Sequence, residues 1–166
     1  MKGALVALTL VTTLVLSGCA EQDEERELAP DYTATKLGGG EASLAGLRGQ
    51  VVMLNLWATW CHPCREEMPD LQELQEEFGP QGLTVVGVTK DTDAVPDSQI
   101  QQSMDAVGVN YTIWRDPFDT FTLTFKAEAT PFTVLIDREG YIVHTWPMAF
   151  EPTSVETKDL LRDTLA

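Results

Sequence analysis

The chain has few cysteines, few histidines and few basic residues. Its 166 residues include 3 cysteines and 2 histidines, and 11 lysines and arginines stand against 26 aspartates and glutamates. A zinc site needs about four ligands, which this supply of cysteine and histidine does not meet. The formal net charge of -15 predicts a surface that repels nucleic acid and anionic lipid head groups. The sequence therefore predicts no metal, no other cofactor and no nucleic-acid partner, and its length predicts one folded domain.

The first 18 residues lack the charges and turn signals of a soluble element. Lys2 supplies one positive charge, and residues 3–18, GALVALTLVTTLVLSG, form a continuous apolar stretch that ends in small residues. This order is typical of a secretory signal peptide. The alternative is a transmembrane anchor, for which the apolar run is on the short side. We therefore predict a signal peptide over residues 1–18 and an exported protein.

The end of this stretch resembles a lipoprotein processing site. The sequence LSGC at residues 16–19 is similar to the lipobox of bacterial lipoproteins. The resemblance implies that Cys19 carries a lipid and becomes the first residue of the mature protein. It also accounts for the odd cysteine, because Cys61 and Cys64 then remain as a matched pair.

Residues 19–30 are acidic and lack an apolar stripe, which is typical of a solvated tether. The predicted domain covers residues 31–166, where apolar runs indicate buried strands and apolar spacings of three and four indicate helices. The predicted strands are 32–35, 50–57, 82–89, 111–114, 131–137 and 141–146. The first predicted helix starts within residues 57–69 and stops at Gly79-Pro80, and the others are 98–108, 117–125 and 153–166. This order predicts an α/β fold with a mixed central sheet flanked by helices on both faces.

Two loops of this domain carry further expectations. Glycines at residues 38–40 predict a turn into a short return strand, which would make an N-terminal β-hairpin. The segment KDTDAVPDSQ, residues 90–99, is acidic, but its spacing does not match an EF-hand calcium loop. We therefore predict that it is a solvated loop.

The segment WATWCHPCREEMP, residues 57–69, places two cysteines where a predicted buried strand ends and a helix begins. The unpaired N–H groups and the dipole of a helix N-terminus stabilise a thiolate, which is the reactive form of cysteine. Cys61 is then the predicted nucleophile, and Cys64, one turn further on, resolves the mixed disulfide. A protonated His62 would favour the Cys61 thiolate, and Pro63 would stiffen the turn. The segment therefore favours a redox-active pair.

The sequence WCHPC at residues 60–64, followed by Pro69 within the helix, resembles the active-site pattern of the thioredoxin superfamily. The flanking segments LNLWATW and REEMP are similar to the TlpA/ResA branch of membrane-tethered, extracytoplasmic thiol-disulfide oxidoreductases. The resemblance runs from about residue 31 to the C-terminus and implies a thioredoxin-like fold. It also implies a cis peptide at Thr130-Pro131 beside the cysteines, with Trp60, Thr130 and Pro131 forming the groove that takes the substrate.

Two further positions fit the TlpA/ResA branch better than thioredoxin itself. Asn55 stands six residues before Cys61, where thioredoxins carry a buried aspartate that handles protons, and an amide cannot do this. The branch uses a glutamate three residues after the second cysteine, and Glu67 matches it. Partial burial near Cys64 would raise the pKa of Glu67 and let it exchange a proton with that thiol near neutral pH. The alternative is that Glu67 is one more solvent-facing acid of this helix.

Other functions compete with disulfide reduction. A structural Cys61–Cys64 disulfide would close a very short loop and constrain the unfolded chain little. A thioredoxin-fold Cu(I) metallochaperone would use both cysteines and His144, because thiolates suit that ion. A thiol peroxidase is disfavoured because Thr59 stands two residues before Cys61, where that pattern needs three. A disulfide oxidase or isomerase is a further alternative, since His62 makes the disulfide more oxidising and the acidic surface makes it less so.

The sequence as a whole predicts a lipid-anchored, extracytoplasmic thiol-disulfide oxidoreductase. The resemblance implies a catalyst that cycles between the Cys61–Cys64 disulfide and the dithiol and reduces disulfides in partner proteins. It also implies that a membrane electron donor recharges the dithiol. Apocytochrome c, before haem attachment, is the substrate class best known for such proteins.

Overall fold

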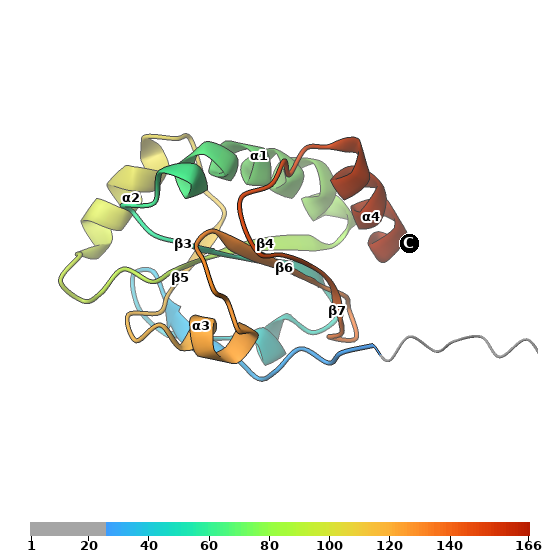
Figure 1. Cartoon of the computed structure of the whole chain (residues 1–166), viewed down its shortest axis with the longest axis horizontal. Helices are drawn as coiled ribbons and strands as arrows, with labels where there is room; N and C mark the ends of the chain where they lie inside the picture. The colour runs from blue at the N-terminus through green and yellow to red at the C-terminus, as the bar shows by residue number, and fades with distance from the viewer. Residues whose placement is uncertain (1–25) are drawn as a thin grey trace, which may run out of the picture.

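The computed structural model describes residues 26–166, which fold around one sheet (Figure 1). The predicted signal peptide, the lipobox with Cys19 and the first part of the predicted tether lie outside the described residues. Within residues 26–166, no helix has the length and apolar content needed to cross a membrane.

Seven strands form a mixed sheet in the order β2-β1-β5-β4-β3-β6-β7. Their bounds are β1 (Thr33–Lys36), β2 (Glu41–Ser43), β3 (Val51–Trp57), β4 (Leu83–Thr89), β5 (Thr112–Arg115), β6 (Phe132–Ile136) and β7 (Ile142–Trp146). β3, β4 and β5 are parallel, whereas β1 and β2 form an antiparallel hairpin and β6 and β7 another. The mixed central sheet and the N-terminal hairpin predicted from the sequence are confirmed.

Helices cover both faces of this sheet (Figure 1). α1 (His62–Phe78), α2 (Asp97–Asp105) and α4 (Val155–Leu165) lie on one face, and α3 (Thr120–Phe125) lies on the other. Two short 3-10 helices, η1 (Leu44–Leu47) and η2 (Gly79–Gln81), complete the elements. The short helix predicted over residues 117–125 therefore forms despite its β-branched residues, because buried Phe121 anchors it to the sheet.

The central strand β3 holds the two layers together and carries the site at its end. All seven of its residues are buried. Met53 and Trp57 belong to the core beneath α1, whereas Leu54 and Leu56 belong to the core on the α3 face. This alternation explains why the strand reads as a continuous apolar run. Asn55 interrupts the run on the α1 side, where the cysteines lie.

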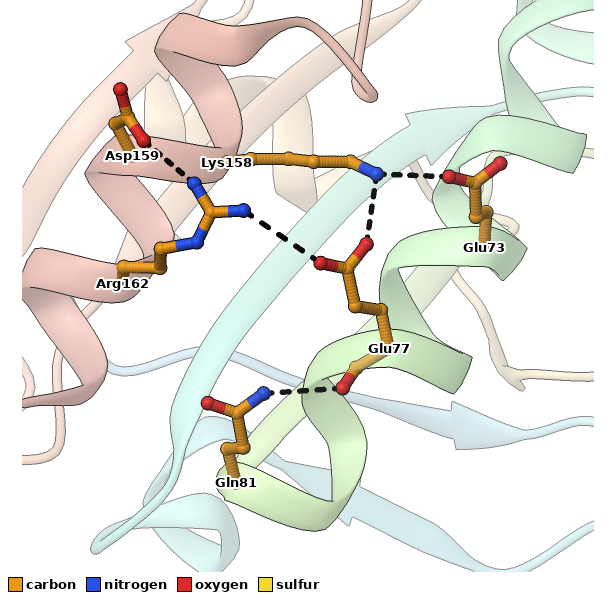
Figure 2. A network of polar contacts seen from close by, with 6 residues as sticks. All are labelled: Glu73, Glu77, Gln81, Lys158, Asp159 and Arg162. Carbon is orange, nitrogen blue, oxygen red and sulfur yellow. Dashed lines mark hydrogen bonds and ion pairs between the residues drawn. The ribbon is translucent and has the colours of Figure 1, made fainter.

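Ion pairs join α4 to the last turns of α1 (Figure 2). The Lys158 ammonium lies 2.9 Å from a Glu73 oxygen and 2.8 Å from a Glu77 oxygen, and Arg162 contacts Asp159 at 2.6 Å and Glu77 at 3.9 Å. The hydrogen bonds to Glu77 and Glu73 raise the pKa of Lys158 above its usual value. Ser154 caps α4 by accepting a hydrogen bond from the Thr157 N–H at 3.3 Å.

Contacts with the domain begin before the boundary predicted at residue 31. The Ile142 N–H donates to the Glu27 carbonyl at 2.7 Å, and the Ala29 N–H donates to the Gly140 carbonyl at 2.9 Å. Ala29 is buried, and Arg26 pairs with Asp137. The reason is that β7 is an edge strand, whose first residues offer backbone groups to another segment.

Candidate active site

Cys61 and Cys64 form a disulfide where β3 leads into α1. Their Cα atoms lie 5.4 Å apart. Cys61 is the N-cap residue of the 17-residue α1, and its Sγ accepts from the Cys64 N–H at 3.3 Å. Cys61 is 4% exposed and Cys64 is 0% exposed. The helix N-terminus would therefore stabilise a thiolate at Cys61, the cysteine that a partner reaches first.

The cis peptide between Thr130 and Pro131 lies beside this disulfide, as the resemblance implies. The Cys61 Sγ is 3.8 Å from the Thr130 carbonyl oxygen. β6, which begins at Phe132, pairs with β3 and so brings residue 130 to the end of the strand that carries the cysteines. Trp60 is 67% exposed beside Cys61. A backbone carbonyl oxygen and an exposed indole ring thus flank Cys61.

Glu67 is buried on the same face of α1 as Cys64 and is 4% exposed. The alternative of a solvent-facing acid is therefore wrong. Burial raises the pKa of Glu67 to about 7, and the hydrogen bond from Asn55 and the backbone hydrogen bond from Phe150 oppose this rise. The Asn55 Nδ2 donates to Glu67 Oε1 at 2.8 Å, and the Phe150 N–H donates to Oε2 at 3.4 Å. Glu67 can therefore gain or lose a proton near neutral pH.

Asn55 orients this carboxyl group. Its Nδ2 also donates to Thr133 Oγ1 at 2.9 Å, so the amide is held between β6 and α1. The sequence indicates for Asn55 only that the aspartate of thioredoxins is absent there. A single polar residue inside a seven-residue apolar strand was the signal that could have revealed its role, because a buried amide needs partners.

Aromatic side chains lie beside the strand position of Asn55, beneath α1. Gly87 lies opposite Asn55 in the sheet, and a Cβ there would come within 3.0 Å of Trp57 Nε1 and 3.1 Å of Tyr111 Cε2. The missing side chain lets both rings pack against the sheet beneath α1. Burial, together with the charge of Glu67, raises the pKa of Tyr111. Burial removes the carboxyl of Glu67 from water, which accounts for its raised pKa.

His62 and Pro63 form the exposed first turn of α1. The His62 Nε2 lies 3.5 Å from Glu66 Oε1, and both side chains are largely exposed. The structure thus places an acid beside the histidine that was expected to favour the Cys61 thiolate. His62 lies at the surface, whereas Glu67 is buried.

Asp91 lies in the segment that the sequence predicts to be a solvated loop, and for this residue the prediction is wrong. Asp91 is 2% exposed and hydrogen-bonds Thr59, which stands two residues before Cys61. The parallel order of β3 and β4 is the reason, because it brings the carboxyl ends of both strands to one edge of the sheet. The spacing of the acidic residues along the loop does not predict the contact between Asp91 and Thr59.

The part of the chain that the structure describes contains no group of three His, Cys, Asp or Glu side chains placed to hold a metal ion. His144 lies on β7, and its ring packs against Trp146 with the centroids 4.5 Å apart. In this disulfide-bonded structure, Cys61, Cys64 and His144 are not gathered into the group that the Cu(I) alternative would use.

The site combines a helix-capping cysteine with a second, buried cysteine, and a cis-proline lies beside them. On a thioredoxin-like fold, this arrangement together with the buried carboxyl group of Glu67 suits thiol-disulfide exchange. The protein is therefore a thiol-disulfide oxidoreductase. Residues 26–145 match the model of the AhpC/TSA family, and the chain belongs to that family.

Named relatives agree with this class. The chain is 33% identical over 114 residues to the thiol-disulfide oxidoreductase ResA of Geobacillus kaustophilus, covering 69% of this chain and 64% of that one. A solved structure described as a thiol:disulfide interchange protein DsbE from Chlorobium tepidum superposes with a TM-score of 0.74 at 26% identity, covering 85% of this chain and 97% of that one. A secreted thiol-disulfide isomerase from Corynebacterium glutamicum gives a TM-score of 0.68 at 27% identity, covering 82% and 83%.

Proposed function

We propose that this protein is an extracytoplasmic, lipid-anchored reductase of disulfides in partner proteins. The observation that carries the proposal is the pairing of the Cys61–Cys64 disulfide with Glu67, a buried carboxyl whose pKa is about 7, on one face of α1. Acidic groups around the site support the reducing direction, because negative charge disfavours the thiolate of the reduced form. The named relatives support an extracytoplasmic location, since one of them is described as secreted.

In the proposed cycle the reduced protein supplies two electrons. The Cys61 thiolate attacks a substrate disulfide, so that a mixed disulfide forms and one substrate thiolate leaves. Cys64 then gives its proton to the Glu67 carboxylate and attacks the Cys61 sulfur. The Cys61–Cys64 bond forms, the second substrate sulfur leaves as a thiolate that takes up a proton, and a membrane electron donor later reduces the disulfide again. Trp60, Thr130 and Pro131 hold the substrate chain beside Cys61.

The reduction potential of the Cys61–Cys64 couple tests the direction of electron flow. We expect a value close to that of thioredoxin, about -270 mV, and far from that of the oxidant DsbA, about -120 mV. Equilibration with glutathione buffers measures it. A value near that of DsbA would contradict the reductase and favour the oxidase alternative.

The substrate class can be tested with two oxidised peptides that differ only after the cysteine pair. Faster reduction of a Cys-x-x-Cys-His peptide than of a matched Cys-x-x-Cys-Ala peptide would support apocytochrome c as the substrate class.

The lipid anchor is proposed from Cys19 and the apolar stretch before it. β6 runs from Phe132, paired with Leu56, to Ile136, paired with Val52, so the following turn lies at the start of β3, away from the disulfide. Residues 27–29 contact this turn. A tether that begins there would leave the disulfide facing the aqueous compartment, where protein substrates reach it.

The mass of the protein expressed with its signal peptide tests this anchor. The wild-type protein should carry the mass of a diacylglyceryl group on Cys19 and partition with membranes. A Cys19→Ser variant should lose both properties and keep its disulfide-exchange activity. Retention of the lipid mass in the variant would refute the assignment.

A further inference from the structure

A buried carboxylate supports the turn that precedes the disulfide. Asp91 follows β4 and is 2% exposed. Its Oδ2 accepts hydrogen bonds from the Thr59 N–H at 2.9 Å and from the Thr89 hydroxyl at 2.7 Å, and its Oδ1 accepts from the Thr59 hydroxyl at 2.9 Å. Three donors directed at two oxygens suit an ionised carboxylate, which has only acceptors.

The bonded turn leads directly to the nucleophile. The Cys61 N–H donates to the Ala58 carbonyl at 3.0 Å, so Thr59 and Trp60 are the central residues of a turn over 58–61. The Lys90 N–H donates to the Trp57 carbonyl at 3.1 Å and fixes the start of this turn to β4 as well. The Cα atoms of Thr59 and Cys61 are at most about 7.6 Å apart, because two trans peptide units join them. Asp91 therefore binds the chain at a residue two positions before the nucleophile.

The cations near Asp91 are engaged with other acids. The Lys90 ammonium pairs with Asp119 at 2.8 Å. Arg115 pairs with Asp97 and donates to the Thr92 carbonyl at 3.1 Å, further along the loop. Within residues 26–166, no lysine, arginine or histidine forms an ion pair with Asp91. No ion pair among the described residues thus neutralises the charge of Asp91, which lies in a buried environment that screens it weakly.

We propose that Asp91 is a positioning residue that holds the turn over 58–61 and makes the Cys61–Cys64 dithiol a stronger reductant. Reduction breaks the S–S bond and takes up two electrons and one proton, which yields a Cys61 thiolate and a Cys64 thiol. A fixed negative charge near Cys61 raises the free energy of this thiolate and leaves the uncharged disulfide unaffected. This inference deepens the proposed reductase function and rests on it for its biological meaning.

The reduction potential of an Asp91→Asn variant tests the proposal. Asparagine keeps the pattern, because its Oδ1 accepts from the Thr59 N–H and the Thr89 hydroxyl while its Nδ2 donates to the Thr59 oxygen. We expect the equilibrium constant for oxidation of the dithiol by oxidised glutathione to fall about tenfold, as a unit charge about 10 Å away at an effective dielectric constant of about 20 would produce. A tenfold change corresponds to a potential about 30 mV more positive. The ultraviolet absorbance of the thiolate should show Cys61 ionising at a lower pH in the variant.

Two further variants separate charge from geometry. Asp93→Asn removes the same charge from an exposed position of the same loop and should leave the potential at the wild-type value. Thr59→Val keeps the Asp91 charge and removes one hydrogen bond, so its potential should not become more positive. An unchanged potential in Asp91→Asn, or an equal positive shift in Asp93→Asn or Thr59→Val, would overturn the proposal. The absolute wild-type potential tests the reductase function, whereas only the differences between variants test Asp91.

Discussion

A Cys64→Ser variant should accumulate a stable mixed disulfide between Cys61 and its substrate. Cys61 is the N-cap of α1 and the more exposed sulfur, so it reacts first, and without Cys64 nothing resolves the intermediate. A Cys61→Ser variant should form no mixed disulfide, because the remaining thiol at Cys64 is fully buried. Turnover should fall to the uncatalysed rate in both. Mass spectrometry of the acid-quenched reaction with an oxidised peptide detects the intermediate.

The two single variants are matched controls for each other, because each removes one sulfur and keeps the other. Their folded state can be checked by circular dichroism before the reaction is started. Capture of the peptide by Cys61→Ser and not by Cys64→Ser would reverse the assignment of nucleophile and resolving cysteine. Capture by both variants at the same rate would mean that the helix N-terminus does not distinguish the two thiols.

Glu67 should make the oxidised protein less stable as the pH rises from 4.5 to about 7. The folded protein holds the Glu67 proton up to about pH 7, whereas the unfolded chain releases it near pH 4.5, so the free energy of unfolding falls between these values. The full loss is about 3 kcal/mol, since each unit of pKa corresponds to about 1.4 kcal/mol. Glu67→Gln should remove this slope. Denaturant unfolding of the oxidised protein across this pH range measures it.

The same variant should slow the release of substrate from the mixed disulfide. A carboxylate that takes the Cys64 proton contributes about 10²-fold, at the lower end of the range for general base catalysis. In the wild-type protein the release rate should rise through about pH 7, as the carboxylate form of Glu67 accumulates. In Glu67→Gln this rise should be absent.

Glu76→Gln provides the control for both measurements. It removes one acid from the same helix at an exposed position, far along α1 from the cysteines. It should keep the wild-type pH slope of stability and the wild-type pH dependence of release. If Glu67→Gln behaved like Glu76→Gln, Glu67 would have no part in proton transfer, and its burial would be a matter of packing alone.

Local patterns predicted the elements that build the site. The apolar run at residues 50–57 became the central strand β3, and the helix pattern that stops at Gly79 became α1. These predictions succeeded because burial on both faces of a strand leaves a continuous apolar run, and burial of one stripe of a helix leaves apolar residues at spacings of three and four. The two cysteines and the helix N-terminus are adjacent in the chain, so the sequence alone also predicted their thiol-disulfide chemistry.

Contacts between distant segments left weaker signals or none. The hydrogen bonds of Glu67 come from Asn55 on β3 and from the backbone of Phe150, which is 83 residues away. A backbone N–H donor has no signature in the amino-acid sequence, because every residue except proline carries one. The burial of Asp91 likewise follows from the parallel pairing of β3 and β4, which a linear pattern does not record.

The sequence by itself determined which two cysteines form the reactive pair, that α1 begins at this pair, and the order of the strands and helices. Each of these features depends on residues that are neighbours in the chain. Only the tertiary structure decided that Glu67 is buried with a pKa of about 7, that Asp91 supports the turn at Thr59, and that His144 lies apart from the cysteines. Those features depend on which strands pair and which helix covers them. The residues that carry the thiol chemistry thus lie within thirteen consecutive positions, 57–69. The groups that exchange protons with these thiols or place charge near them come together only when distant segments pack in the fold.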